Sequence, residues 1–191
     1  MPRSLKPDHL GKLIRELGHW HKSTSAQTRR DALAIEFGLL GLRISEVRNL
    51  LIRNVDHQEH RLFVQTLKGG TPGHIFFPTR LTNSIIEQAS NRDREQPLFI
   101  TSRGNRLDTR NLRRRFTTMV QRVTGEHYRF HDLRHTVAQE LYRKSGHNIL
   151  VVSQVLRHKN LANTAIYLTS AKQVADWMDH TQDQDGLEAT H

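Results

Sequence analysis

Cysteine is absent from this chain of 191 residues. That absence excludes a disulfide framework, thiolate catalysis and a cysteine-based zinc site. Long apolar runs are missing as well: the opening stretch MPRSLKPDHLGKLIREL has no signal-peptide core, and no window approaches the roughly 20 apolar residues of a membrane span. We therefore expect a cytoplasmic protein without a membrane partner.

Acidic residues are outnumbered, since 19 Asp and Glu stand against 29 Lys and Arg, for a formal net charge of +10. This excess favours a polyanionic partner, although many basic proteins merely solvate their charges. The stretch TSRGNRLDTRNLRRR (101–115) holds six arginines and one acid, Asp108. These arginines could follow a phosphate backbone, and for any one of them simple solvation is an equal alternative. They are Arg103, Arg106, Arg110, Arg113, Arg114 and Arg115.

Apolar residues recur every three to four positions, which predicts a mainly helical protein. Ser25 and Thr28 are both N-cap candidates for the second helix, and Asp108 is the candidate for the helix that follows SRGNRL. The stretch HRLFVQTLKGGTPGHIFFP (60–78) breaks this period and predicts a β-hairpin with Lys68 near its tip. LLIRNVD (50–56) is a candidate third strand. The expected fold class is therefore mainly α with a small antiparallel β-sheet (α+β). Helices are expected over residues 7–18, 25–40, 44–51, 80–95, 108–123, 131–145, 148–156, 161–168 and 171–179.

The stretch GLLGLRISEVRNL (38–50) places Arg43 and Glu46 three residues apart at the start of a helix, where their side chains are neighbours. Taken alone, this spacing is typical of a surface ion pair. A functional arginine would need its guanidinium held towards a phosphate or carboxylate, and Glu46 could orient it.

The stretch RFHDLRHTVAQEL (129–141) puts His131 on one helix face with Arg134 and His135. Its HDLRH spacing imitates the zinc motif H-E-x-x-H, but Asp132 replaces the glutamate and no third ligand stands at a recognisable spacing, which disfavours zinc. Two alternatives remain: donors to a phosphate oxygen, or solvated histidines at a helix start.

The stretch LRHKNLANTAIYLTSA (156–171) contains His158 and, nine residues later, Tyr167. A tyrosine among apolar residues usually packs in a core, but a tyrosine can also act as a covalent nucleophile. Together with the arginine, lysine and histidine motifs upstream, it completes a set suited to metal-free attack on a phosphodiester.

This ordered set resembles the tyrosine recombinase family, also called the phage integrase family, whose pattern is Arg, Lys, His-x-x-Arg, His or Trp, then Tyr. The resemblance runs from about residue 28 to 172. GLRISEV is similar to the first arginine box, LKGG to the hairpin lysine, HDLRH to the second box and VLRHKNLANTAIYL to the closing box. One departure is Arg157, because the family usually has glycine before this histidine.

The resemblance implies that Tyr167 attacks a DNA phosphodiester, forms a 3′-phosphotyrosine and releases a 5′-hydroxyl, without ATP or any cofactor. It implies that Arg43 and Arg134 hold the phosphoryl oxygens, that His131 assists the tyrosine as general base, and that Lys68 is the general acid. The implied catalytic set is Arg43, Lys68, His131, Arg134, His158 and Tyr167, with Glu46 and His135 in support.

The resemblance also implies a domain plan: an N-terminal extension or helix (1–24), a catalytic domain (25–180) and a flexible acidic tail (181–191). The chain is then either a minimal recombinase, similar to fimbrial DNA invertases, or the catalytic portion of a longer protein. The implied partners are double-stranded DNA with a specific recombination site, in the nucleoid, and further copies of the chain, four in a synapse. A catalytically silent DNA-binding regulator and a type IB topoisomerase-like relaxase are the alternatives.

Overall fold

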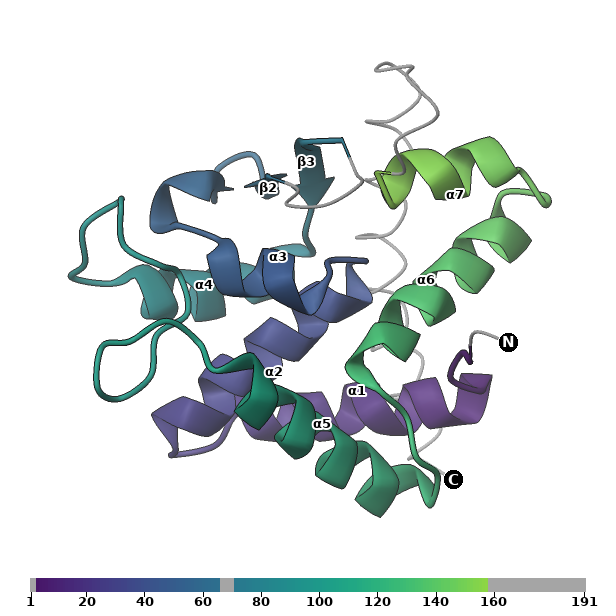
Figure 1. Cartoon of the computed structure of the whole chain (residues 1–191), viewed down its shortest axis with the longest axis horizontal. Coiled ribbons are helices and arrows are strands. Elements are labelled where there is room, and N and C mark those ends of the chain that lie inside the picture. Colours follow the sequence, from purple (N-terminus) through teal and green to yellow (C-terminus); the bar gives the residue numbers. More distant parts are fainter. Residues whose placement is uncertain (1–2, 66–70, 158–191) are drawn as a thin grey trace, which may run out of the picture.

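The computed structural model of this chain describes residues 3–65 and 71–157 (Figure 1). This part is mainly helical and contains one antiparallel sheet of three strands, which confirms the predicted fold class. Several predicted features lie outside the described residues: Lys68, His158, Tyr167, the helices expected over 161–168 and 171–179, and the acidic tail.

The helices begin and end close to the predicted residues. Ser25 caps α2, because its hydroxyl accepts a hydrogen bond from the main-chain N–H of Thr28 at 3.3 Å, and Asp108 caps α5 in the same way. The helix expected over 80–95 is shorter than predicted: it ends at Ala89, and Asn91 then adopts a left-handed φ of 58°, which turns the chain. The helices are α1 (Pro7–His21), α2 (Ala26–Leu39), α3 (Ile44–Asn49), α4 (Thr82–Ala89), α5 (Thr109–Thr124), α6 (Phe130–Lys144) and α7 (Ile149–Val155), with 3-10 turns η1 (Ile52–Asn54) and η2 (Thr79–Leu81).

The sheet has the order β1-β2-β3, and its strands are β1 (Val55–Asp56), β2 (Arg61–Val64) and β3 (Gly73–Phe76). Leu62 pairs with Ile75 across β2 and β3, and both side chains are buried. The predicted hairpin is therefore confirmed. The candidate third strand is only partly right, because its last two residues pair with β2 while the preceding three form η1.

Helix α2 lies at the centre of the molecule and packs against α1, α3, α4 and α6 (Figure 1). Every residue from Arg30 to Leu42 is buried, so this helix carries charged side chains into the core. Asp31 is paired with Arg30 at 2.5 Å, and Glu36 is paired with Arg80 at 2.6 Å. Buried carboxylates are tolerated here because each has a cationic partner.

Gly38 sets how closely α6 approaches α2. A β-carbon at this position would lie 2.8 Å from Leu133 Cδ1 and 2.8 Å from Phe130 Cζ, so only glycine fits between the two helices. The close approach brings the start of α6 beside the turn that leads from α2 into α3. Within the described ranges, no helix combines the length and apolarity that crossing a bilayer requires.

Candidate active site

Arg43 stands at the N-cap of α3, directly after a tight turn from α2. Gly41 makes this turn with a φ of 87°, a conformation that glycine adopts without a steric penalty. A β-carbon on Gly41 would also lie 2.8 Å from Leu156 Cδ2, so the end of α7 packs on the turn. The arginine side chain is 28 % exposed, which leaves it able to reach a ligand.

Glu46 is the buried acceptor at the centre of the site, with a side chain only 2 % exposed. Its Oε2 accepts from the main-chain N–H of Arg43 at 2.7 Å, which caps α3, and its Oε1 accepts from Arg43 Nη1 at 3.1 Å. Arg157 Nη2 donates to the same Oε2 at 2.8 Å. The predicted pairing of Arg43 with Glu46 is therefore present, but Glu46 belongs to the core and not to the surface.

Arg134 lies on α6 with 4 % of its surface exposed. Its Nη1 donates to the carbonyl of Gly41 and its Nη2 to the carbonyl of Leu156, so one guanidinium joins α6 to the α2–α3 turn and to the end of α7. Burial, together with the neighbouring guanidiniums of Arg43 and Arg157, lowers the pKa of Arg134 to about 9. The site therefore concentrates positive charge, as the binding of an anion requires.

His131 lies in the first turn of α6 and is exposed to solvent on the same side as Arg43. Its ring centroid lies 4.7 Å from that of His135 in an edge-to-face arrangement. Partial desolvation lowers the pKa of His131, and the charges of His135, Arg134 and Arg43 act in the same direction. The imidazole is therefore neutral near pH 7 and able to accept a proton. Among the described residues, no group of three or more His, Asp or Glu side chains could hold a metal.

An open cavity of about 440 Å³ lies between the start of α3, the start of α6 and the face of α5. Arg43 and His131 line it together, so the first and second motifs of the sequence lie close to each other in space. Two further arginines, Arg113 and Arg129, line the same cavity. Its other lining residues are Leu42, Ile44, Ser45, Thr117 and Phe130.

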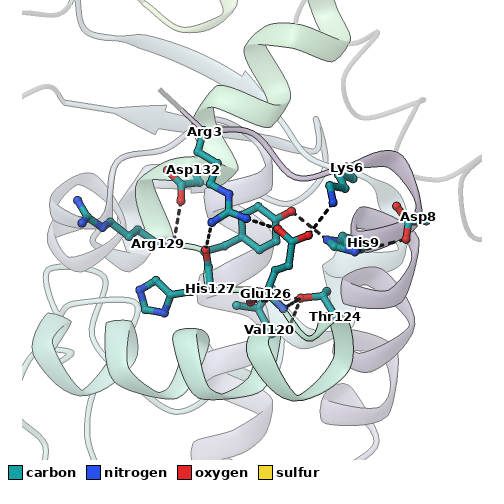
Figure 2. A network of polar contacts seen from close by, with 11 residues as sticks. Arg3, Lys6, Asp8, His9, Val120, Thr124, Glu126, His127, Arg129 and Asp132 are labelled. Carbon is teal, nitrogen blue, oxygen red and sulfur yellow. Dashed lines mark hydrogen bonds and ion pairs between the residues drawn. The ribbon is translucent and has the colours of Figure 1, made fainter. Parts of the chain in front are cut away.

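A polar network secures the chain just before α6 (Figure 2). Asp132 caps the helix by accepting from the main-chain N–H of Arg129 at 2.7 Å. Arg3 and Lys6 both reach Glu126, with Lys6 Nζ at 2.6 Å, so the N-terminal segment is tied to the α5–α6 connection. This network anchors the connection that leads into the first turn of α6, where His131 lies.

The segments that carry the remaining motif residues approach one another at their described ends. The main-chain N–H of Thr71, directly after the segment 66–70, donates to the carbonyl of Arg157 at 3.1 Å. Lys68 belongs to that segment, and His158 follows Arg157. Neither catalytic candidate lies in the described part of the chain, but Thr71 and Arg157, which are close to them in the sequence, are in contact.

The sequence profile of the phage integrase family matches residues 3–174. The chain belongs to this family. Among curated proteins, tyrosine recombinase XerC of Corynebacterium efficiens is 32 % identical over 173 residues, covering 87 % of this chain and 54 % of the relative. XerC of Pseudomonas entomophila is 33 % identical over 145 residues, covering 73 % and 48 %. This phage integrase family chain thus spans about half the length of these relatives.

Solved structures of recombinases share the fold. A crystal structure of XerA recombinase aligns with a TM-score of 0.66 and 23 % identity, covering 94 % of this chain and 65 % of that one. The pre-cleavage complex of XerH with difH DNA aligns with a TM-score of 0.70 and 20 % identity, covering 92 % and 52 %. The mainly helical fold with its small sheet is therefore the fold of tyrosine recombinase catalytic domains.

In this phage integrase family member, the six arginines of residues 101–115 do not form one surface. Arg113 faces the cavity beside Arg43, whereas Arg103 and Arg106 line a separate hollow next to Arg30. Arg115 is half-buried, because its Nε lies 2.6 Å from Asp31 Oδ2 and its guanidinium stacks over Trp20. Arg110 and Arg114 are exposed on α5.

Two residues of the site were not selected from the sequence. Arg129 lines the cavity, and its position two residues before His131 was the available signal. In the sequence, Arg157 stands out only as a departure from the family pattern, yet its side chain is 1 % exposed and bonded to Glu46. Sequence could not reveal this contact because its partners are 111 positions apart.

Proposed function

We propose that this chain cleaves and rejoins DNA strands at a specific site through a covalent bond between Tyr167 and a 3′-phosphate. The observation that carries the proposal is the convergence of Arg43 and Arg134 around Glu46, with His131 beside them. Two guanidiniums held in place suit a phosphodiester whose negative charge grows in the transition state. Membership of the phage integrase family and the names of its relatives support the same chemistry.

In the proposed reaction, Tyr167 Oη bonds to phosphorus while its proton passes to His131. The bond between phosphorus and the 5′-oxygen breaks, and Lys68 protonates the leaving oxygen. A 5′-hydroxyl from a second strand then reverses the step, so the energy of the phosphodiester is retained in the phosphotyrosine and no nucleotide hydrolysis or cofactor is needed. His158 hydrogen-bonds the phosphate. A tyrosine pKa of about 10 makes proton removal necessary near pH 7.

The central test uses Tyr167→Phe on a nicked suicide substrate that traps the covalent adduct. We expect the unaltered chain to form the adduct and the variant to form none. Tyr142→Phe is the matched control, because Tyr142 is an exposed tyrosine on α6 whose removal should leave adduct formation unchanged. An adduct formed by the Tyr167 variant would overturn the assignment, and supercoil relaxation without exchanged strands would point to a relaxase.

We also propose that the exposed arginines of α5 contact the DNA backbone. Arg113 is the best candidate because it faces the cavity that Arg43 lines. Replacing it with glutamine should make the plot of log affinity against log salt shallower by about 1 in slope, as loss of one phosphate contact does. Arg122→Gln removes the same charge two and a half turns further along the helix, on the opposite face, and should leave the slope unchanged. Equal slopes for both variants would count against the contact.

We further propose that the chain acts on a double-stranded recombination site in the nucleoid. Four copies of the chain would assemble on two duplexes. Exchange of strands between two duplexes requires a nucleophile for each of the four strands, which four copies supply. Mass measurement of the chain on synapsed duplexes tests the stoichiometry.

A further inference from the structure

Arg157 occupies a strained position at the end of α7. Its φ is 55°, in the left-handed region that disfavours residues with a β-carbon and suits glycine. The family usually has glycine at this point of the motif, and glycine is the residue type that this backbone conformation favours. This chain has arginine there instead. A side chain kept in such a conformation needs a compensating interaction from its surroundings.

The compensating interaction is with the carboxylate that holds Arg43. Arg157 Nη2 lies 2.8 Å from Glu46 Oε2, and the two side chains are 1 % and 2 % exposed. The other oxygen of Glu46 binds Arg43 Nη1. Glu46 therefore lies between two arginines, and its orientation depends on both. Within the described residues, Nε and Nη1 of Arg157 have no hydrogen-bond partner, so Glu46 is the only anchor found there for this guanidinium.

The backbone at the same place joins two further parts of the site. The carbonyl of Leu156 accepts from Arg134, and the carbonyl of Arg157 accepts from Thr71, next to the segment that contains Lys68. The ion pair with Glu46 consequently ties this whole turn to α3. Without it, the turn would keep the hydrogen bonds of these two carbonyls and the packing of Leu156 on Gly41, but no contact with α3 through Glu46.

We propose that Arg157 is a positioning residue, which acts through Glu46 to hold the guanidinium of Arg43 in place for strand cleavage. This inference rests on the proposed function. Because the side chain of Arg157 is buried, we expect it to govern the rate of cleavage and to leave DNA affinity unchanged. The family's usual glycine would relieve the backbone strain here but would remove the second partner of Glu46.

The test compares Arg157→Gly with Arg157→Lys on the nicked suicide substrate under single-turnover conditions. Loss of one charge-assisted contact to Glu46 should slow adduct formation by about tenfold or more in the glycine variant. Lysine keeps the charge and should recover part of the rate. DNA affinity, measured by fluorescence anisotropy, should stay within about twofold for both. Asn91→Gly is the matched control, since it relieves a similar φ of 58° at an exposed residue and should not change the rate.

A second comparison separates action through Glu46 from a general effect on the fold. In a Glu46→Gln background, replacing Arg157 with glycine should change the rate little further, because coupled residues do not act additively. Additive effects, a lysine variant no faster than the glycine variant, or a glycine variant as fast as the unaltered chain would each overturn the proposal. If the glycine variant fails to fold, Arg157→Gln replaces it in the comparison with lysine. No adduct from the unaltered chain would instead refute the proposed function.

Discussion

Replacing Glu46 with glutamine perturbs the site at its centre while keeping the shape of the side chain. The carboxylate accepts three hydrogen bonds, from Arg43 N at 2.7 Å, Arg43 Nη1 at 3.1 Å and Arg157 Nη2 at 2.8 Å. Glutamine offers one acceptor oxygen, and its amide group would face one of these donors with a donor of its own. The two guanidiniums would also lose the negative charge between them.

The expected loss of stability follows from burial. Removing one partner of a buried ion pair typically costs about 3–5 kcal/mol, because the remaining charge is left uncompensated. Glu46 and Arg157 are 2 % and 1 % exposed, so the full range applies to this pair. For a chain of this length, each kcal/mol lowers the melting temperature by roughly 2–4 °C, so we expect a decrease of about 6–20 °C.

Urea unfolding followed by circular dichroism measures how much the substitution lowers the free energy of unfolding. Glu95→Gln is the matched control. Glu95 and Arg53 form a pair at 2.5 Å, but their side chains are 64 % and 51 % exposed. An exposed pair contributes about 0–1 kcal/mol, so the control should unfold nearly as the unaltered chain does. If Glu46→Gln destabilised the protein no more than Glu95→Gln, the role of Glu46 as a buried anchor would be refuted.

Two further predictions concern His131 on α6 and the packing of α6 against α2. His131 accepts a proton only when neutral, so adduct formation should fall as pH drops through its pKa, at a midpoint below the ordinary value of 6.5. His135→Gln removes one of the charges that lower this pKa and should move the midpoint to higher pH; a midpoint that stays or falls would contradict it. Gly38→Ala should destabilise the fold by about 1–3 kcal/mol in urea unfolding, because its methyl group would lie 2.8 Å from Leu133 Cδ1. Gly18→Ala, in open space on α1, should instead stabilise by up to about 1 kcal/mol, and equal effects of the two would refute the packing argument.

Structural features that depend on residues close together in the sequence were predictable. The apolar period places the helices, Ser25 and Asp108 cap them, and the turn composition around Lys68 predicts a hairpin whose described strands pair as expected. The helix expected over 80–95 was too long, since its apolar spacing continues where the backbone already turns at Asn91. Periodicity reports which residues could face a core, but it does not report where the core ends.

The candidate site was predictable as a set of residue types and only in part as a geometry. The order of Arg43, HDLR and the closing motif, read from the sequence, indicated the family to which the chain belongs. The spacing of Arg43 and Glu46 predicted their contact but favoured a surface pair, whereas Glu46 is buried. Likewise, Arg115 looked like one member of a basic run, yet its charge is engaged by Asp31.

By itself, then, the sequence determined the helical class, the hairpin and the caps, because each depends on residues close together in the chain. It also determined the ordered motif, because that motif consists of residue types in a fixed order and needs no geometry to be recognised. Only the tertiary structure decided which charges are buried and which remain available to a ligand. The reason is physical: the free energy of an arginine depends on its burial and on its partner, and the partner of Arg157 lies 111 positions away in the chain. That single contact turns a departure from the family pattern into part of the site.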